Sequence, residues 1–389
     1  MIAHAAGPLE HGGDLAAARR MFPHAPEPFI DLSTGINPYP YKVPTLPPAL
    51  FERLPQSDEL ARLAAVAAKA YGAPAPACVV AAPGTQILLP LIAALKPPGR
   101  AAILGPTYAE HARTAALAGH RVIETQELRR VGDADLAIVV NPNNPDGRIV
   151  ATADLLALAG ELRSRGGILI VDEAFMEIDP ANAGICSARV DPHSAHSRGS
   201  GKPDLFNKPG SSPSRGRGDR LSVSETSASL AGEVERGNIV VLRSFGKFFG
   251  LAGLRLGFAI AAPDIAARLR ASLGPWAVSG PAIAIGETAL ADSAWIAAMQ
   301  RKLAQLAQRL DALLISAGLD IVGGTSLFRL AQTPAAAAVY ERLGRRGLLV
   351  RRFAEHPTWL RFGLPGDEPA WERFARALNA NRRSEQRNR

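Results

Sequence analysis

The stretch "SFGKFFGLAGLRLGF", residues 244–258, places a lysine, Lys247, between a glycine and two phenylalanines shortly after an apolar run. A lysine beside aromatic side chains most often lies at a strand end, where its amine reaches solvent. A lysine amine that is kept away from water loses its proton more easily and becomes a nucleophile toward carbonyl groups. The residues that accompany Lys247 elsewhere in the chain decide between these two interpretations.

The chain has 389 residues, 47% of them hydrophobic, and this length favours a two-domain globular protein. No apolar stretch reaches the roughly 18 residues that span a membrane, and the N-terminus lacks the pattern of a signal peptide. We therefore expect a cytoplasmic protein without membrane contact. The two cysteines, Cys78 and Cys186, lack CxxC spacing, so we expect neither a disulfide framework nor a metal site.

The net charge of +8 is concentrated in two polar stretches. Residues 187–220 contain seven Lys and Arg against three Asp, a net of +4, and the tail "NRRSEQRNR" contributes +3. The rest of the chain is almost neutral, which argues against a basic face for nucleic acid. We expect the first stretch to belong to an insertion, residues 187–232, that is rich in Ser, Gly, Pro and Arg.

Short apolar runs such as "CVVAAPG", "LAIVVNP", "GGILIVDEA" and "NIVVLRS" alternate with helical segments. This alternation predicts an α/β fold with a mostly parallel sheet. Ligands in such sheets bind at the carboxyl ends of the strands, so the polar residues after each run are candidates for one common pocket. They include Gly84-Thr85-Gln86, Thr107-Tyr108, Asn144, Asp172 and Ser244.

A phosphate could be held by residues from two of these strand ends. Gly84, Thr85 and Gln86 open a helical run, so their N–H groups and the Thr85 hydroxyl suit an anion, or alternatively only cap a helix. Ser244 and Arg255, on either side of the lysine, would add a hydroxyl and a guanidinium.

Three further residues suit an aromatic ring. Asp172 ends an apolar run, where a carboxylate needs a cation such as a protonated pyridine nitrogen. Asn144, in "NPNNPDG", offers an amide to a ring hydroxyl, although asparagine is also an ordinary turn residue. The side chain of Tyr108 is suited to stack on such a ring; the alternative interpretation is that it only packs within its loop. With a reactive lysine, these groups match a cofactor that has a phosphate, an aromatic cation and an aldehyde.

From about residue 281 the pattern changes to a long Ala- and Leu-rich helical segment followed by short strands. This change predicts a smaller C-terminal domain. We expect residues 1–44 to form an N-terminal arm and part of the small domain. Residues 45–275 would form the large domain and residues 276–389 the small one.

The motifs "NPNNPDG", "VDEAF" and "SFGKFFGLAGLRLGF", in this order, resemble the fold type I, pyridoxal-phosphate-dependent aminotransferases of class I/II. The resemblance implies a large domain with a mostly parallel seven-stranded sheet, a smaller α+β domain and a homodimer. It also implies that Lys247 forms a Schiff base with pyridoxal 5′-phosphate, Asp172 pairs with the pyridine nitrogen and Asn144 bonds the ring hydroxyl. The implied cofactor-binding set is completed by Gly84, Thr85, Gln86, Tyr108, Ser244 and Arg255.

The N-terminal stretch "HGGDLAAARRMFPHAPEPFIDLSTGINPYPYKVP", together with "GPTYAEHART", resembles the threonine-phosphate decarboxylase branch of this superfamily. The resemblance implies five substrate-binding residues: His11, Gly35, Asn144, Arg351 (with Arg352 as the adjacent alternative) and Arg361. Two positions depart from superfamily patterns. Leu54 stands where many members have a tyrosine that reaches the partner subunit, and Phe175 stands where aspartate aminotransferases have a tyrosine.

The branch implies a carboxy-lyase that converts L-threonine O-3-phosphate to (R)-1-aminopropan-2-ol O-2-phosphate in cobalamin biosynthesis. Histidinol-phosphate aminotransferase, or a related amino transfer, is the alternative that the sequence leaves open, because the motifs do not show which bond of the substrate breaks. A binding protein without activity is a third interpretation, which the intact Lys247, Asp172 and Asn144 disfavour.

Overall fold

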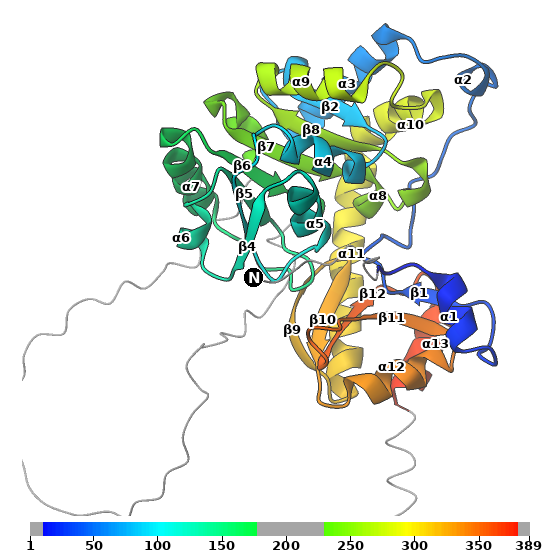
Figure 1. The fold of residues 1–389 in the computed structure, drawn as a ribbon. Coiled ribbons are helices and arrows are strands. Elements are labelled where there is room, and N and C mark those ends of the chain that lie inside the picture. The colour runs from blue at the N-terminus through cyan, green and yellow to red at the C-terminus, as the bar shows by residue number, and fades with distance from the viewer. Residues whose placement is uncertain (1–10, 177–228, 380–389) are drawn as a thin grey trace, which may run out of the picture.

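The computed structural model describes residues 11–176 and 229–379, which form two β-sheets, each with its own helices (Figure 1). The larger sheet has seven strands. In spatial order they are β2 (Val79–Ala82), β8 (Gly257–Ala261), β7 (Ile239–Ser244), β6 (Ile168–Asp172), β5 (Leu136–Val140), β3 (Arg100–Leu104) and β4 (Arg121–Thr125). β8 runs antiparallel to both neighbours and the other pairs are parallel.

The strands of the large sheet are apolar on both faces because helices cover both. Along β7, Ile239 and Val241 enter one hydrophobic cluster, and Val240 and Leu242 enter another. This explains the continuous apolar runs in the sequence, which are typical of parallel sheets. The expected α/β fold with a mostly parallel seven-stranded sheet is confirmed.

The helices of this part begin and end where the sequence supplies the caps. α3, for example, starts with a capping box between Gln56 and Glu59 and stops at Gly72, whose φ of 71° suits glycine. The helices are α2 (Ala49–Glu52), α3 (Ser57–Tyr71), α4 (Leu88–Ala93), α5 (Glu110–Leu117), α6 (Leu128–Val131), α7 (Thr152–Ser164), α8 (Phe245–Phe248), α9 (Pro263–Leu273) and α10 (Gly280–Ala291).

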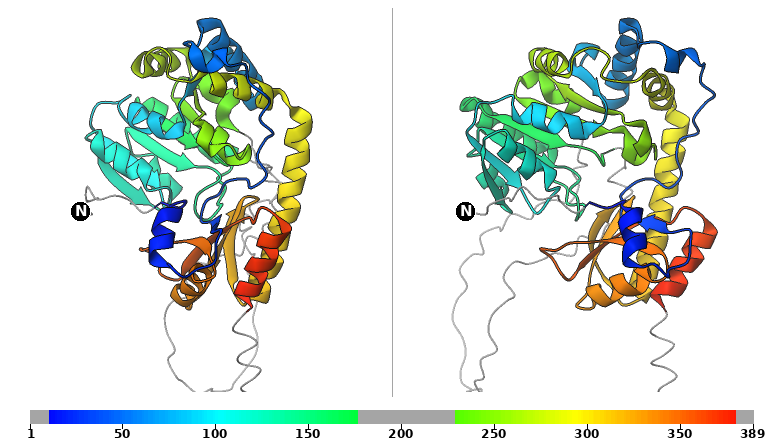
Figure 2. Two further views of the ribbon diagram at one scale, coloured as in Figure 1. Left: turned by 90° about the vertical axis from the view of Figure 1, so that its right-hand side faces the viewer. Right: turned by 45° about the vertical axis from the view of Figure 1, so that its right-hand side comes forward.

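The smaller sheet combines the two ends of the described chain. Its order is β1 (Ile30–Leu32), β11 (Leu348–Arg352), β12 (Trp359–Gly363), β10 (Phe328–Gln332) and β9 (Asp320–Thr325). β1 lies parallel to β11, with Ile30 opposite Leu348, so the N-terminal segment joins the C-terminal strands. The associated helices are α1 (Leu15–Met21), α11 (Ser293–Ser316), α12 (Ala336–Gly344) and α13 (Glu368–Leu378). Figure 2 shows α11 along one side of the molecule, from the large sheet to the small one.

Most of the expected insertion, residues 187–232, lies outside the described residues, as does Cys186. The last four residues of that range are part of the folded body, because Ser229 precedes the 3-10 helix η4 (Leu230–Arg236), in which Leu230 and Ala231 are fully buried. The carboxylate of Glu173, next to the end of β6, accepts hydrogen bonds from the Ser229 hydroxyl at 2.6 Å and the Leu230 N–H at 2.8 Å. These bonds attach the start of η4 to the sheet.

Among the described residues, no single helix has the length and apolar character to cross a membrane; only α10 and α11 taken together do, across a 77° bend.

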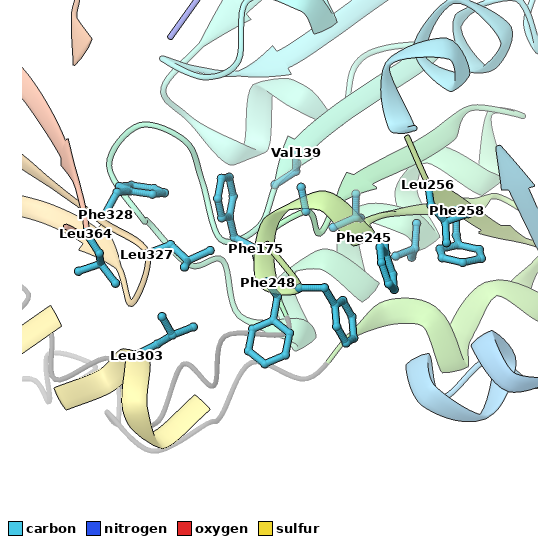
Figure 3. Packing of buried hydrophobic residues seen from close by; sticks show 14 of the residues in the cluster. Val139, Phe175, Phe245, Phe248, Leu256, Phe258, Leu303, Leu327, Phe328 and Leu364 are labelled. Carbon is cyan, nitrogen blue, oxygen red and sulfur yellow. The ribbon is translucent and has the colours of Figure 1, made fainter. Parts of the chain in front are cut away.

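The apolar residues of the lysine segment, residues 244–258, belong to the protein core. Phe245 and Phe248 are fully buried (Figure 3). Phe249 stacks between Phe245, at a centroid distance of 4.4 Å, and Trp295 of α11, at 5.6 Å.

Replacing Phe249 with alanine should lower the free energy of unfolding by about 3–5 kcal/mol, because the stacked core position leaves a cavity that its neighbours cannot fill. Urea unfolding of the purified protein measures this change. Leu117→Ala is the control, since Leu117 is 73% exposed and should change stability by less than about 0.5 kcal/mol. Equal losses in the two variants would contradict the stacked core described above.

Candidate active site

A cavity of about 190 Å³ lies at the carboxyl ends of β2, β5, β6 and β7. All nine residues that the sequence predicted for the cofactor line it: Gly84, Thr85, Gln86, Tyr108, Asn144, Asp172, Ser244, Lys247 and Arg255. The parallel sheet brings them together because strands that are distant in the sequence end on the same edge. We call this space the first cavity.

Lys247 belongs to α8, the short helix that follows β7, and its side chain lies in the first cavity. Its backbone carbonyl accepts a hydrogen bond from the Asn37 N–H at 3.0 Å, which holds the N-terminal segment against the lysine. Burial, assisted by the nearby charge of Arg361 and partly opposed by Asp172, lowers the pKa of Lys247 to about 8. The neutral, nucleophilic amine is therefore accessible near physiological pH, in contrast to a solvent-exposed lysine.

One end of the first cavity is shaped for an anion. Gly84 has a φ of 86°, and a Cβ at this position would lie 2.7 Å from a guanidinium nitrogen of Arg255. Arg255 itself adopts the left-handed φ of 56°, an uncommon conformation for a residue with a side chain. Glycine is thus required where the chain approaches Arg255. The guanidinium, the backbone around Thr85 and the hydroxyl of Ser244 surround a space suited to a phosphate.

At the other side of the cavity Asp172, the last residue of β6, is only 7% exposed. Its Oδ1 accepts a hydrogen bond from the Ala174 N–H at 3.0 Å, and its Oδ2 lies 2.9 Å from Nε2 of His111. His111 is buried on α5, and the sequence alone does not identify it, because a lone histidine in a helix is usually an ordinary core residue. It orients a carboxylate that lies in a position suited to a cationic ring nitrogen.

The loop that carries Asn144 is tied to the loop that carries Tyr108. The buried Asn143 accepts a hydrogen bond from the Thr107 hydroxyl at 2.6 Å and donates to the Pro106 carbonyl at 2.9 Å. The Tyr108 hydroxyl donates to Oε1 of Gln86 at 3.1 Å. Burial and the carboxylate of Glu110 raise the pKa of Tyr108 to about 12, so the phenol stays protonated.

Arg361, on β12, connects three parts of the chain. It donates one hydrogen bond to Oδ1 of Asn144 and another, of 2.7 Å, to the Ser33 carbonyl. Because Oδ1 of Asn144 is the acceptor, its amide nitrogen is left to donate to a ligand. Burial, with the neighbouring Arg351, lowers the pKa of Arg361 to about 10, which still leaves the side chain cationic at neutral pH. Its Nε is a buried donor without a partner among the described residues.

A second cavity, of about 340 Å³, adjoins the first and shares Tyr108 and Asn144 with it. Besides Asn144, its lining includes three more of the five residues predicted for the substrate, His11, Arg351 and Arg361, which come from both ends of the described chain. Arg352 lies on the lining too. The two arginines of β11 nevertheless differ, because Arg351 is directly opposite Arg361 in the antiparallel ladder and Arg352 is opposite Leu360.

Facing arginines on one side of a sheet repel each other, and an anion between them removes that cost. The register therefore favours Arg351 over Arg352 as the partner of Arg361 in anion binding. Gly35 differs from the other predicted substrate residues, since it is not on the lining of either cavity. A Cβ on Gly35 would lie 2.9 Å from the ring of Phe328 and 3.0 Å from that of Phe175, so its missing side chain makes room for these rings.

The model of the aminotransferase class I and II family matches residues 51–378, so the chain belongs to this family. Among its relatives, a threonine-phosphate decarboxylase from Sinorhizobium sp. is 39% identical over 95% of this chain and 98% of its own length. A threonine-phosphate decarboxylase from Pseudomonas aeruginosa is 38% identical over 95% of this chain and 97% of its own length. A histidinol-phosphate aminotransferase from Citrifermentans bemidjiense is more distant, at 28% identity over 84% of each chain.

The fold is also that of a solved structure, histidinol-phosphate aminotransferase from Sinorhizobium meliloti in complex with pyridoxal-5′-phosphate. The similarity has a TM-score of 0.72 and covers 99% of each chain at 19% identity. Pyridoxal 5′-phosphate is the cofactor of the family, and the first cavity fits it. The buried carboxylate of Asp172 matches a pyridinium nitrogen, the contact between Gly84 and Arg255 matches a phosphate, and the desolvated Lys247 matches an aldehyde.

The rate at which the cofactor-free protein reacts with pyridoxal 5′-phosphate should rise with pH, with a midpoint near 8, and level off at higher pH. Below the pKa of about 8 the Lys247 amine is protonated and cannot attack a carbonyl. Stopped-flow absorbance measures the rate, and the Lys247→Ala variant is the control for reaction at other lysines. A midpoint near 10 would contradict the desolvated environment of the amine.

Replacing Asp172 with asparagine should reduce turnover more than tenfold, which corresponds to more than ~1.4 kcal/mol, because a neutral amide no longer holds a proton on a ring nitrogen. Circular dichroism should show an intact fold, since the amide can still accept the bond from Ala174. The matched variant His111→Gln keeps the carboxylate and should lose less activity. A loss below tenfold in Asp172→Asn would count against the pairing.

Proposed function

We propose that this protein is a pyridoxal-phosphate-dependent carboxy-lyase that decarboxylates L-threonine O-3-phosphate to (R)-1-aminopropan-2-ol O-2-phosphate, a step of cobalamin biosynthesis. The observation that carries the proposal is the second cavity, which lies beside the cofactor cavity and is lined by His11, Arg351 and Arg361. The near full-length similarity to two proteins named threonine-phosphate decarboxylase supports the same substrate.

A phosphorylated amino acid brings two anionic groups, a carboxylate and a phosphate with nearly two negative charges at neutral pH. Arg361 suits the carboxylate, because it is buried next to Asn144 and its Nε lacks an acceptor among the described residues. Arg351 and His11 suit the phosphate. Histidinol phosphate has a phosphate and no carboxylate, so it would use only part of this charged set.

Bound pyridoxal 5′-phosphate supplies an electron sink that allows a bond at the α-carbon of an amino acid to break. Gly84, Thr85, Ser244 and Arg255 would hold its phosphate, and Tyr108 and Gln86 would line its ring. Asp172 would keep its ring nitrogen protonated, and the amide of Asn144 would donate to its hydroxyl. The centroid of the Phe175 ring lies 5.7 Å from Nζ of Lys247. Phenylalanine, unlike the tyrosine of aspartate aminotransferases, has no hydroxyl group at this position.

Lys247 has two tasks in this scheme. Its neutral amine would hold the cofactor aldehyde, and Nζ, when free, would carry a proton. In the cofactor-free protein the pKa of Lys247 is about 8, so Nζ can both accept and release a proton near neutral pH. Delivery of that proton to the α-carbon, after carbon dioxide has left, would complete the decarboxylation.

Incubation of the holoenzyme with L-threonine O-3-phosphate tests the reaction. Released carbon dioxide and aminopropanol phosphate, without accumulation of pyridoxamine phosphate, are the expected products. Lys247→Ala is the negative control. Accumulation of pyridoxamine phosphate without carbon dioxide would instead establish an aminotransferase, the alternative function.

The variants His11→Ala and Arg351→Ala should raise the KM for threonine phosphate by about tenfold or more, because each removes a cationic partner of the phosphate. Neither should change the visible absorbance of the holoenzyme. Arg361→Ala should weaken threonine phosphate and plain L-threonine alike, since both carry the carboxylate. Spectroscopic titration with the two ligands measures the difference. Equal weakening of both ligands in His11→Ala would remove this histidine from phosphate recognition.

We also propose that the protein is a cytoplasmic homodimer with an N-terminal arm in residues 1–44, a large domain in residues 45–275 and a small domain in residues 276–389. Of the small domain, α10 (Gly280–Ala291) packs on α3 of the large domain. Several large apolar side chains are exposed in the single chain, which supports the proposal that a second copy of the chain covers them in a dimer. They include Val43, Phe51, Leu54, Ile87 and Trp276. Analytical ultracentrifugation of the wild-type protein and of Phe51→Lys tests the dimer.

A further inference from the structure

The first residue of α5, Glu110, is a buried carboxylate that the scheme above does not use. It is 3% exposed, and its two oxygens contact three side chains, two of which come from distant parts of the chain and one from α5 itself. Oε1 lies 3.0 Å from Nε2 of His11. Oε2 accepts hydrogen bonds from Nε2 of Gln86 at 3.0 Å and from Arg113 at 3.3 Å. A carboxylate is costly to bury, so these contacts require an explanation.

The contact with Glu110 determines which nitrogen of His11 faces a ligand. An ionised carboxylate only accepts hydrogen bonds, so Nε2 of His11 must carry the proton. Nδ1 is then the nitrogen left for a group in the second cavity, which His11 lines. A phosphate also only accepts, so the ring serves both partners when both nitrogens carry protons.

Glu110 also contacts the first cavity through Gln86. Since the Gln86 amide nitrogen donates to Glu110, its Oε1 is turned to accept the hydrogen bond from the Tyr108 hydroxyl at 3.1 Å. The Tyr108 ring also lies against His11, with a centroid distance of 5.9 Å. One carboxylate therefore connects a residue of the second cavity to two residues of the first.

We propose that Glu110 is a positioning residue for recognition of the substrate phosphate, because it orients His11 through Nε2 and links this histidine to the Gln86 and Tyr108 pair. The inference rests on the proposed function, in which His11 binds the phosphate. It assigns to Glu110 a role in discriminating phosphorylated from unphosphorylated amines, without contact between Glu110 and the ligand.

The test uses two amines that cannot be decarboxylated, ethanolamine phosphate and ethanolamine, in calorimetric titrations of the holoenzyme. Glu110→Gln keeps the size of the side chain and removes its charge. We expect the Kd for ethanolamine phosphate to rise about tenfold and that for ethanolamine to change less than about twofold. In a His11→Ala background, Glu110→Gln should add no further loss, because the carboxylate acts through the histidine.

Asp154→Asn is the matched control, since it removes an exposed carboxylate from the first turn of α7, away from both cavities, and should leave both constants unchanged. If Glu110→Gln does not fold, Glu110→Asp retains the charge, withdraws it from His11 and should give the same selective loss. Equal losses for both amines, or losses that multiply in the double variant, would overturn the inference. If the wild-type protein does not prefer ethanolamine phosphate, the assignment of His11 and the proposed function fail instead.

Discussion

The guanidinium of Arg361 links the parts of the chain on which the site depends. It comes from β12 of the small sheet, and it donates to Asn144, which follows β5 of the large sheet, and to the carbonyl of Ser33 in the N-terminal segment. Each of these bonds is charge-assisted and mostly buried, so each is stronger than a surface contact. Without Arg361 the loop of Asn144 and the N-terminal segment would lose their common partner.

The same cation influences the chemistry of the lysine. Burial is the main reason for the low pKa of Lys247, and the positive charge of Arg361 adds to it, while Asp172 opposes it. The site thus combines two buried cations and a buried carboxylate within a small region. Such an arrangement costs folding free energy, which the large hydrophobic clusters on both faces of the seven-stranded sheet offset.

Close backbone contacts fix the loop that carries Asn144 against β9 of the small sheet. A Cβ on Gly147, in the loop that carries Asn144, would overlap the carbonyl oxygen of Gly324 in β9, and a Cβ on Gly323 would overlap that of Asp146. Only glycine permits this approach. The loop of Asn144 is therefore held from two directions, by backbone contact with β9 and by the side chain of Arg361.

The sequence alone determined the α/β fold and the set of residues around the first cavity, because apolar runs predict strands and the residues after parallel strands meet at one edge. It did not reveal His111 and Glu110, whose roles depend on partners 61 and 99 residues away in the chain. It also left Arg351 and Arg352 as alternatives. Only the register of β11 against β12 separates them, since neighbouring residues of a strand point to opposite faces and a shift of one residue would exchange the two side chains.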